Sequence, residues 1–213
     1  MSDQQIFALL NAILPNWQRQ IQRWIYSGDL LAAALDTLRP LDGLPSAWAR
    51  EDLQGVLRPW ANGDWSSLPN IRLLNAQEMG PLAAAYAADI QTIFLNGEWV
   101  STQSESTLFP VLTEELGHHL DRVLNRLDSP GDEGRRFADR LYNRLSPDTS
   151  TAEDWTVLTL ADGQSIKVEH ALIDGGEGND TLVGTDGPDT LDAREGDDRI
   201  EGLGGADVLN SGL

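Results

Sequence analysis

The chain has 213 residues, of which 40% are hydrophobic and 23% charged, a composition that supports a buried core in one or two domains of roughly 100 to 200 residues. Its 34 acidic residues outnumber the 15 basic ones and give a net charge of −19, which argues against nucleic acid or an anionic membrane surface as a partner. Because the chain contains no cysteine, disulfides, thiolate metal sites and cysteine nucleophiles are excluded.

Residues 1–66 are predicted to be helical. Apolar residues recur at helical spacing in a stretch that ends at Pro15, again over residues 17–25, and again over residues 30–38. A fourth helix is expected between Pro45 and Pro59. The tryptophans of this region indicate either core packing or a groove for a partner; they are Trp17, Trp24, Trp48, Trp60 and Trp65.

Two strands are predicted over residues 84–87 and 92–96, followed by a long helix from about residue 106 to 125. At about 100° per residue, one face of that helix is apolar, and its members are Leu112, Leu116, Leu120, Val123 and Leu127. Glu114, His118 and Asp121 fall together on the opposite side.

The spacing of Glu114 and His118 leaves two interpretations open. In the first, the two side chains form a solvated contact at i and i+4 that stabilises the helix by a few tenths of a kcal/mol. In the second, a carboxylate and an imidazole on one face bind the same metal ion, and Glu115 beside them accepts a proton. The spacing alone favours the solvated contact.

The wider pattern favours the metal site. A tyrosine-containing strand, a second strand ending in Leu95-Asn96 and a helix with Glu114-Glu115-Leu116-Gly117-His118 resemble the zincin metallopeptidases, whose helix motif is H-E-x-x-H. The resemblance implies that Glu114 and His118 are metal ligands and that Glu115 is the general base. It also implies that Glu133, in the segment 130–134, is the third ligand. Tyr86 is expected either to line the substrate groove, with residues 92–96, or to be part of the core.

The match departs from the zincin pattern at its first position, where glutamate replaces histidine. The implied donor set is therefore two carboxylates and one imidazole, which suits Zn²⁺ or another divalent transition metal and is harder than zinc sites usually are. If Glu114 is not a ligand, His119 or Asp121 is the alternative, and Asp132 is the alternative to Glu133.

Residues 151–173 are predicted to form a β-hairpin, with strands over 155–160 and 165–170 on either side of an Asp162-Gly163 turn. We expect this hairpin to cap the segment that follows it. His170 is interpreted as a side chain of the hairpin and not as a metal ligand.

Residues 174–213 contain 11 acidic residues against two basic ones, and glycine becomes frequent there. Three sets of positions advance in steps of nine residues, which indicates an internal repeat. The sets are Gly178, Gly187, Gly196 and Gly205; Asp180, Asp189, Asp198 and Asp207; and Leu182, Leu191, Ile200 and Leu209. A flexible acidic tail is the alternative interpretation.

The unit is written most fully at residues 175–183 and resembles the calcium-binding nonapeptide repeats of the repeats-in-toxin (RTX) family. Glycine carbonyls and aspartate carboxylates supply the oxygen ligands that Ca²⁺ prefers, so the four glycines and four aspartates above are the predicted calcium-binding residues. The resemblance implies a parallel β-roll that pairs Asp180 with Asp198 and Asp189 with Asp207. Without calcium we expect these carboxylates to repel one another and the segment to be disordered.

Departures from the repeat pattern occur in the third and fourth units. Ala193 and Arg194 stand where the third unit would have paired glycines, and Leu203 replaces one glycine of the fourth. These substitutions are expected to weaken the two turns.

The sequence therefore predicts an α+β protein with a helical region (1–66), a zincin-like metal-site domain (67–150), a capping hairpin (151–173) and a calcium-binding β-roll (174–213). The expected function is that of a secreted bacterial calcium-binding protein with a metal-dependent peptidase domain. The alternative is a non-catalytic RTX exoprotein whose helical domain is a structural or partner-binding module.

The expected location is extracellular. No apolar run reaches the roughly 18 residues that a membrane span needs, and the first residues lack the basic segment of a cleavable signal peptide. The RTX resemblance implies export by a signal-peptide-independent type I route.

Overall fold

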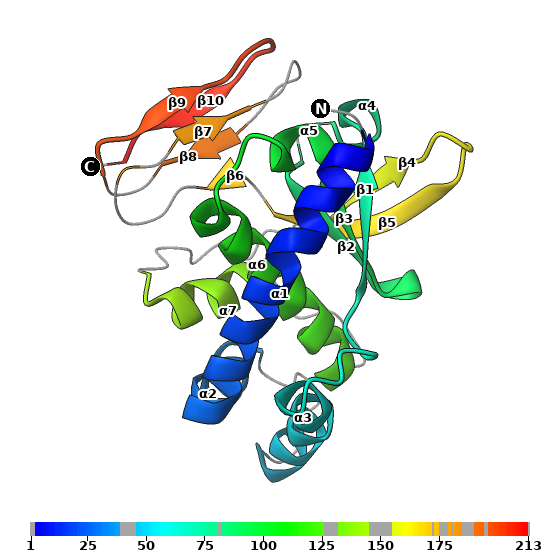
Figure 1. Cartoon of the computed structure of the whole chain (residues 1–213), viewed down its shortest axis with the longest axis vertical. Helices are drawn as coiled ribbons and strands as arrows, with labels where there is room; N and C mark the ends of the chain where they lie inside the picture. Colours follow the sequence, from blue (N-terminus) through cyan, green and yellow to red (C-terminus); the bar gives the residue numbers. More distant parts are fainter. Residues whose placement is uncertain are drawn as a thin grey trace.

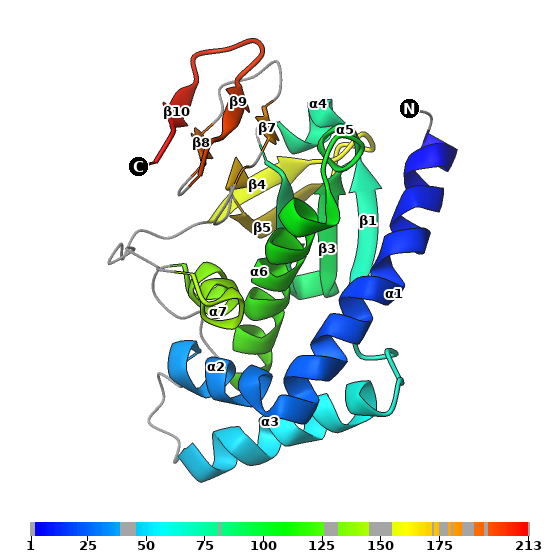
Figure 2. The ribbon, with the colours of Figure 1, turned by 60° about the vertical axis from the view of Figure 1, so that its left-hand side comes forward.

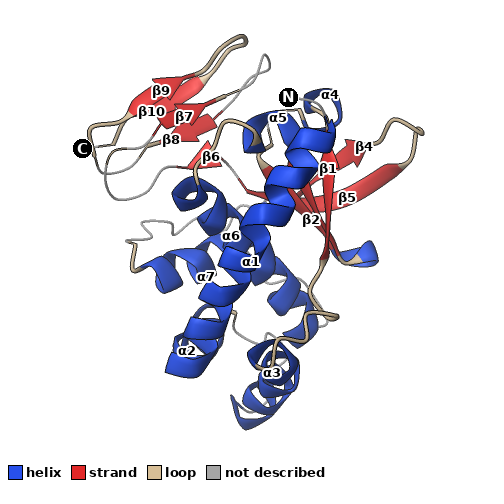
Figure 3. Cartoon of the chain, viewed as in Figure 1, coloured by secondary structure: helices blue, strands red, loops and turns tan. Residues whose placement is uncertain are grey.

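The computed structural model describes residues 3–38, 46–80, 82–125, 132–144, 155–171, 173–174, 179, 181–184, 190–193 and 196–212. Within these residues the protein mixes helices and strands, as the sequence predicts. Helices gather on one side of a five-stranded sheet, and a separate set of short strands lies at one end (Figure 1; Figure 3).

Three helices begin the chain: α1 (Asp3–Ser27), α2 (Asp29–Thr37) and α3 (Ser46–Ala61). The prediction of a helix end at Pro15 is wrong, because α1 continues through it. A proline removes one backbone donor and bends a helix without always ending it, and Leu10 and Trp17, on either side of Pro15, are buried in the same core. No helix in the described part of the chain is long and apolar enough to cross a membrane.

The tryptophans of this region whose side chains the structure describes contribute mainly to the core, and the side chain of Trp48 lies outside that set. Trp17, Trp24 and Trp60 are buried, and Trp65 stacks on Trp60 with ring centroids 6.5 Å apart. The indole nitrogen of Trp17 donates to Thr113 at 3.0 Å.

The main sheet consists of β1 (Asn70–Leu74), β2 (Ala84–Ala87), β3 (Thr92–Asn96), β4 (Trp155–Thr159) and β5 (Ser165–Ala171). Its strand order is β1-β3-β2-β5-β4. β1 runs parallel to β3, and the other neighbouring pairs are antiparallel. Two short helical segments connect the first three strands, α4 (Ala76–Met79) and η1 (Ala88–Ile90), and a third, α5 (Gly97–Val100), follows β3.

The strands predicted at 84–87 and 92–96 and the hairpin predicted around Asp162-Gly163 are all present. The hairpin is an integral part of the main sheet, because β5 pairs with β2. Leu158, Ile166 and Val168 of the hairpin are buried in one cluster with Phe94 of β3, which explains why it joins this sheet.

The opposite face of the sheet is covered by α6 (Glu105–Leu124) and α7 (Glu133–Tyr142). Figure 2 shows α6 between α7 and the strands β1 and β3. Tyr86 of β2 is directly opposite Glu169 of β5, and residues paired in this way project from the same face of a sheet. Since Tyr86 shares a core with Leu112 and Leu116 of α6, Glu169 is on the face that α6 covers.

The C-terminal strands are β6 (Ile173–Asp174), β7 (Thr181–Val183), β8 (Thr190–Asp192), β9 (Arg199–Glu201) and β10 (Val208–Asn210). β8 pairs in parallel with both β6 and β10, and β7 pairs in parallel with β9. The side chain of Asn210 donates to that of Asp192, 18 residues earlier in the chain. Paired strands are therefore two repeats apart.

Candidate metal centre

The polar face of α6 is buried. Glu115 and His118 are fully inaccessible to solvent, and Glu114 is 6% exposed. The solvated interpretation of the Glu114–His118 pair is therefore wrong, because α7 and the sheet cover the face that sequence spacing placed in water. Val123, assigned to the apolar face, is 40% exposed.

The crossing of α6 and α7 is very close at two glycines. A Cβ atom on Gly117 would lie 2.7 Å from Gly134 Cα, and one on Gly134 would lie 2.5 Å from His118 Nε2. Only residues without a side chain allow this approach, which brings the first turn of α7 against the His118 ring.

Two carboxylates converge on the His118 ring. Its Nδ1 atom lies 3.2 Å from Glu133 Oε1 and 3.0 Å from Glu169 Oε2. Ligand atoms of these three residues all lie within 4.8 Å of one another. Glu133 is fully buried, and its second oxygen, Oε2, has no hydrogen-bond partner among the described residues.

A second group shares the same histidine. Glu114, His118 and Asp132 also offer ligand atoms within 4.8 Å of one another. Asp132 caps the N-terminus of α7, where its Oδ1 accepts from Arg135 N at 2.8 Å. Burial raises the pKa of Asp132, and the nearby His118 opposes that shift.

The structure thus divides the predicted ligands Glu114, His118 and Glu133 between two groups. His118 belongs to both, Glu133 to one and Glu114 to the other. The alternate ligand Asp132 belongs to the group of Glu114.

Glu169 was not predicted as a site residue. In the hairpin it alternates with the buried Val168 and is in register with Trp155 of β4, which is 44% exposed, so the local pattern indicates a solvent-facing side chain. Only the pairing of β5 with β2 places it beside α6. The sequence contains no local signal for that pairing.

The alternate ligands His119 and Asp121 each contact another residue. His119 Nδ1 is hydrogen-bonded to Tyr86 Oη at 2.9 Å, and burial lowers the pKa of His119 to about 4 despite a hydrogen bond to the backbone of Ser67. Asp121 Oδ1 accepts from Asn125 Nδ2 at 2.6 Å. Among the described residues, neither is part of a metal-binding group.

Tyr86 does not line an open groove; of its two expected positions, the core is the one that it occupies. It is fully buried in the main core, since α6 covers its face of the sheet. Burial raises the pKa of its hydroxyl above the ordinary value, and the charge of Glu169 raises it further.

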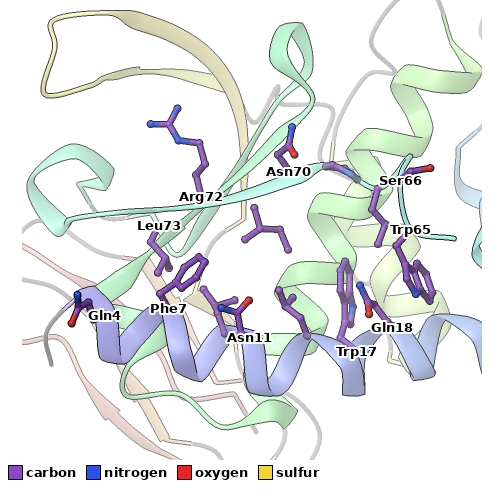
Figure 4. A pocket seen from close by; sticks show the side chains of 15 residues that line it. Gln4, Phe7, Asn11, Trp17, Gln18, Trp65, Ser66, Asn70, Arg72 and Leu73 are labelled. Carbon is purple, nitrogen blue, oxygen red and sulfur yellow. The ribbon is translucent and has the colours of Figure 1, made fainter. Parts of the chain in front are cut away.

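A cavity of about 820 Å³ lies between α1 and β1, away from these groups (Figure 4). Phe7 and Trp17 line it from α1, and Ile71 and Leu73 line it from β1. None of the predicted site residues is part of its lining.

Half of the predicted calcium-binding residues are within the described chain. Gly196 and Gly205 have positive φ angles of 146° and 124°, and Asp198 and Asp207 follow them two residues later. The backbone nitrogen of Asp197 donates to Asn179 Oδ1 at 3.1 Å across 18 residues of sequence. Gly178, Asp180, Gly187 and Asp189 lie outside the described residues, so the pairs Asp180–Asp198 and Asp189–Asp207 stay predictions.

Comparison with known families identifies the C-terminal segment. Residues 174–209 match the RTX calcium-binding nonapeptide repeat in four copies, which confirms the predicted repeats. Repeats of this family bind Ca²⁺ and are typical of secreted proteins. Neither the curated proteins nor the solved structures provide a significant match to the chain.

Proposed function

We propose that this chain, whose residues 174–209 are calcium-binding RTX repeats, is a secreted protein that holds one divalent transition-metal ion in its globular part. The observation that carries this proposal is the convergence of Glu133 and Glu169 on Nδ1 of the buried His118, at 3.2 and 3.0 Å. The match supports calcium binding, and the His118 cluster supports the second metal.

The electrostatics of the cluster favour an ion over a proton. A proton on Nδ1 can be donated to only one of the two carboxylates at a time. A buried charge without a partner is costly, and Glu133 is fully buried. A divalent cation accepts electron pairs from the imidazole and both carboxylates at once. It also provides a partner for the buried Oε2 atom of Glu133.

The donor chemistry narrows the choice of ion. One imidazole with two carboxylates is a mixed nitrogen and oxygen set that suits Zn²⁺, Mn²⁺ or Fe²⁺. Glu133 and Glu169 are the proposed carboxylate ligands because both lie within hydrogen-bond distance of the same ring nitrogen. Glu114 and Asp132 form a second group with the same histidine, and they are not assigned to this ion.

The metal content of purified protein tests the proposal. After dialysis with calcium present, we expect about one zinc, manganese or iron ion per chain. Glu133→Gln should lower the affinity for that ion by at least about tenfold, because it removes a ligand charge and keeps the side-chain volume.

Asp139→Asn is the matched control, since Asp139 is buried on the same helix and belongs to neither group. Equal metal retention by the wild type and Glu133→Gln would remove Glu133 from the site. Calcium as the sole bound metal in the wild type would overturn the proposal.

Peptide-bond hydrolysis is a second candidate function, and the position of Glu115 favours it. Glu115 is fully buried, and in the sequence it lies between the ligand candidates Glu114 and His118. The charges of Glu115 and His118 both act on the pKa of the Tyr86 hydroxyl. A bound ion of this kind supplies an acidified water and polarises a carbonyl. Glu115 would be the residue that accepts a proton from the attacking water.

Glu115→Gln separates the two functions. If the chain is a peptidase, this variant retains its metal ion and loses cleavage of an unstructured protein substrate such as casein. Cleavage by Glu115→Gln at the wild-type rate would exclude Glu115 as the base. A metal-loaded wild type that cleaves no substrate favours the non-catalytic alternative, in which the globular part is a structural or partner-binding module.

The proposal includes a parallel β-roll for the calcium-loaded repeats. The parallel pairing of β6 with β8, β8 with β10 and β7 with β9 supports it, as does the burial of Leu182 and Leu191 at the apolar position of their units. Export by a type I route that needs no N-terminal signal peptide completes the proposal and is supported by the repeats alone.

A further inference from the structure

The repeat strands share an apolar core with the helices of the metal centre. Leu182, Leu191 and Ala193 are fully buried, and they belong to the same cluster as Leu116 of α6 and Phe137 of α7. Ala193 occupies a position where the repeat pattern favours glycine. Its methyl group therefore contributes to packing between the repeats and the globular part, which accounts for this departure.

A polar connection joins the same two parts. Arg135 follows the proposed ligand Glu133 by two residues, and its Nη2 atom lies 3.9 Å from Asp192 Oδ2 of β8. Asp192 Oδ1 accepts from Asn210 Nδ2 of β10 at 3.1 Å. The side chain that pairs with Arg135 is thus held in place by the pairing of two repeat strands.

The other carboxylate ligand is connected to the same repeat strand through the backbone. Glu169 lies in β5, which ends at Ala171, and a single residue separates it from the start of β6 at Ile173. β6 then pairs with β8, and Asp174 is opposite Asp192. Both proposed carboxylate ligands are therefore linked to β8, Glu169 along the chain and Glu133 through Arg135.

We propose that calcium loading of the repeats increases the affinity of the His118–Glu133–Glu169 centre for its transition-metal ion. This inference rests on the proposed metal centre. Calcium orders the repeats, the ordered strand β8 fixes Arg135 and the start of β6, and the two carboxylates are then held in the geometry that binds the ion. Outside a cell, where calcium is abundant, the centre is loaded, whereas inside it is weak.

The zinc affinity of the full chain, measured with and without calcium, tests this coupling. Competition with a fluorescent zinc chelator gives the dissociation constant in saturating calcium and in magnesium at the same ionic strength. We expect binding roughly tenfold tighter in calcium, a typical size for coupling between two sites. Because coupling is reciprocal, saturating zinc should lower by the same factor the calcium concentration that orders the repeats, which circular dichroism measures.

Two variants test the route. Asp192→Asn keeps the acceptor for Asn210 and removes the charge that faces Arg135, and Ala193→Gly removes the buried methyl group. A double variant that carries both substitutions should keep the calcium-dependent ordering of the repeats. In it, calcium should change the zinc affinity by less than about threefold. Glu201→Gln is the matched control, because Glu201 is a repeat residue whose ion pair with Arg199, at 2.8 Å, stays within β9.

The outcomes separate the two proposals. If the wild type binds no zinc in either buffer, the metal centre itself is absent. If it binds zinc equally well in both, the centre stands and the coupling fails. Full coupling in the double variant would exclude the route through β8. Hydrogen exchange of residues 165–171 in the wild type checks the route independently of the variants, because calcium should slow this exchange if the route holds.

Discussion

Leu203 has a left-handed backbone conformation that most side chains avoid. Its φ angle is 64°, and its side chain is 57% exposed, so it contributes little to packing while it bears a cost of about 1 kcal/mol for a Cβ atom in this conformation. It is one of the positions at which the sequence departs from the glycine pattern of the repeats, and the geometry agrees with the prediction of a weakened fourth turn.

Leu203→Gly should therefore lower the calcium concentration at which the repeats become ordered. Leu209→Gly is the matched control, because Leu209 is similarly exposed, at 50%, but lies in strand β10, where glycine weakens the structure by roughly 0.5 to 1 kcal/mol. A calcium titration followed by circular dichroism compares them. An equal increase of the midpoint in both variants would show that the backbone at Leu203 is not strained.

The candidate site could be predicted in part from single residues. His118 and Glu133 were expected from a motif whose members lie close together in sequence, and the structure brings them to 3.2 Å. Glu169 could not be predicted, because its position depends on the pairing of β5 with β2, which joins segments far apart in the chain. The burial of Tyr86 likewise depends on a contact between distant segments, because α6 covers its face of the sheet.

Helices α6 and α7 are held at their crossing by Gly117 and Gly134. A Cβ atom on Gly134 would lie 2.6 Å from Glu114 O as well as against the His118 ring, and neither the helix backbone nor a buried ring can move away easily. This contact fixes the distance between His118 on one helix and Glu133 on the other.

Gly134→Ala should lower the free energy of unfolding by about 1 to 3 kcal/mol, the usual cost of overpacking, and should also weaken metal binding. Gly55→Ala is the control, because Gly55 is exposed on α3 with no atom within 4 Å of the added Cβ. That variant should be stabilised by roughly 0.5 to 1 kcal/mol. Urea denaturation in saturating calcium measures both, and a neutral Gly134→Ala would mean that the helices are not in close contact.

Most of the helices and strands could be predicted. The two main corrections concern which other elements pack against them. The helix expected at 106–125 is α6 at 105–124, yet its polar face is buried because α7 packs there. The hairpin is present as expected, but it extends the main sheet. Hydrophobic periodicity indicates where an element begins and which face is apolar, and it does not indicate which distant element packs against a polar face.

The whole chain carries a charge of −19, and its acidic residues serve two structural purposes. Those of the repeats belong to a family that binds calcium, whereas those of the globular part include several that are buried around His118: Glu114, Glu115 and Glu133. Under the proposal above, cations compensate charge in both places. The molecule is therefore expected to be least stable when calcium and the transition metal are both removed.

The proposed metal ion binds to His118 together with carboxylates. X-ray absorption at the zinc edge, on the full chain in saturating calcium, reports the number of imidazole ligands. With no cysteine and three histidines in the chain, of which His119 is hydrogen-bonded to Tyr86, we predict one imidazole with oxygen ligands, and loss of that imidazole in His118→Ala. An all-oxygen zinc site that is unchanged in His118→Ala would contradict the account.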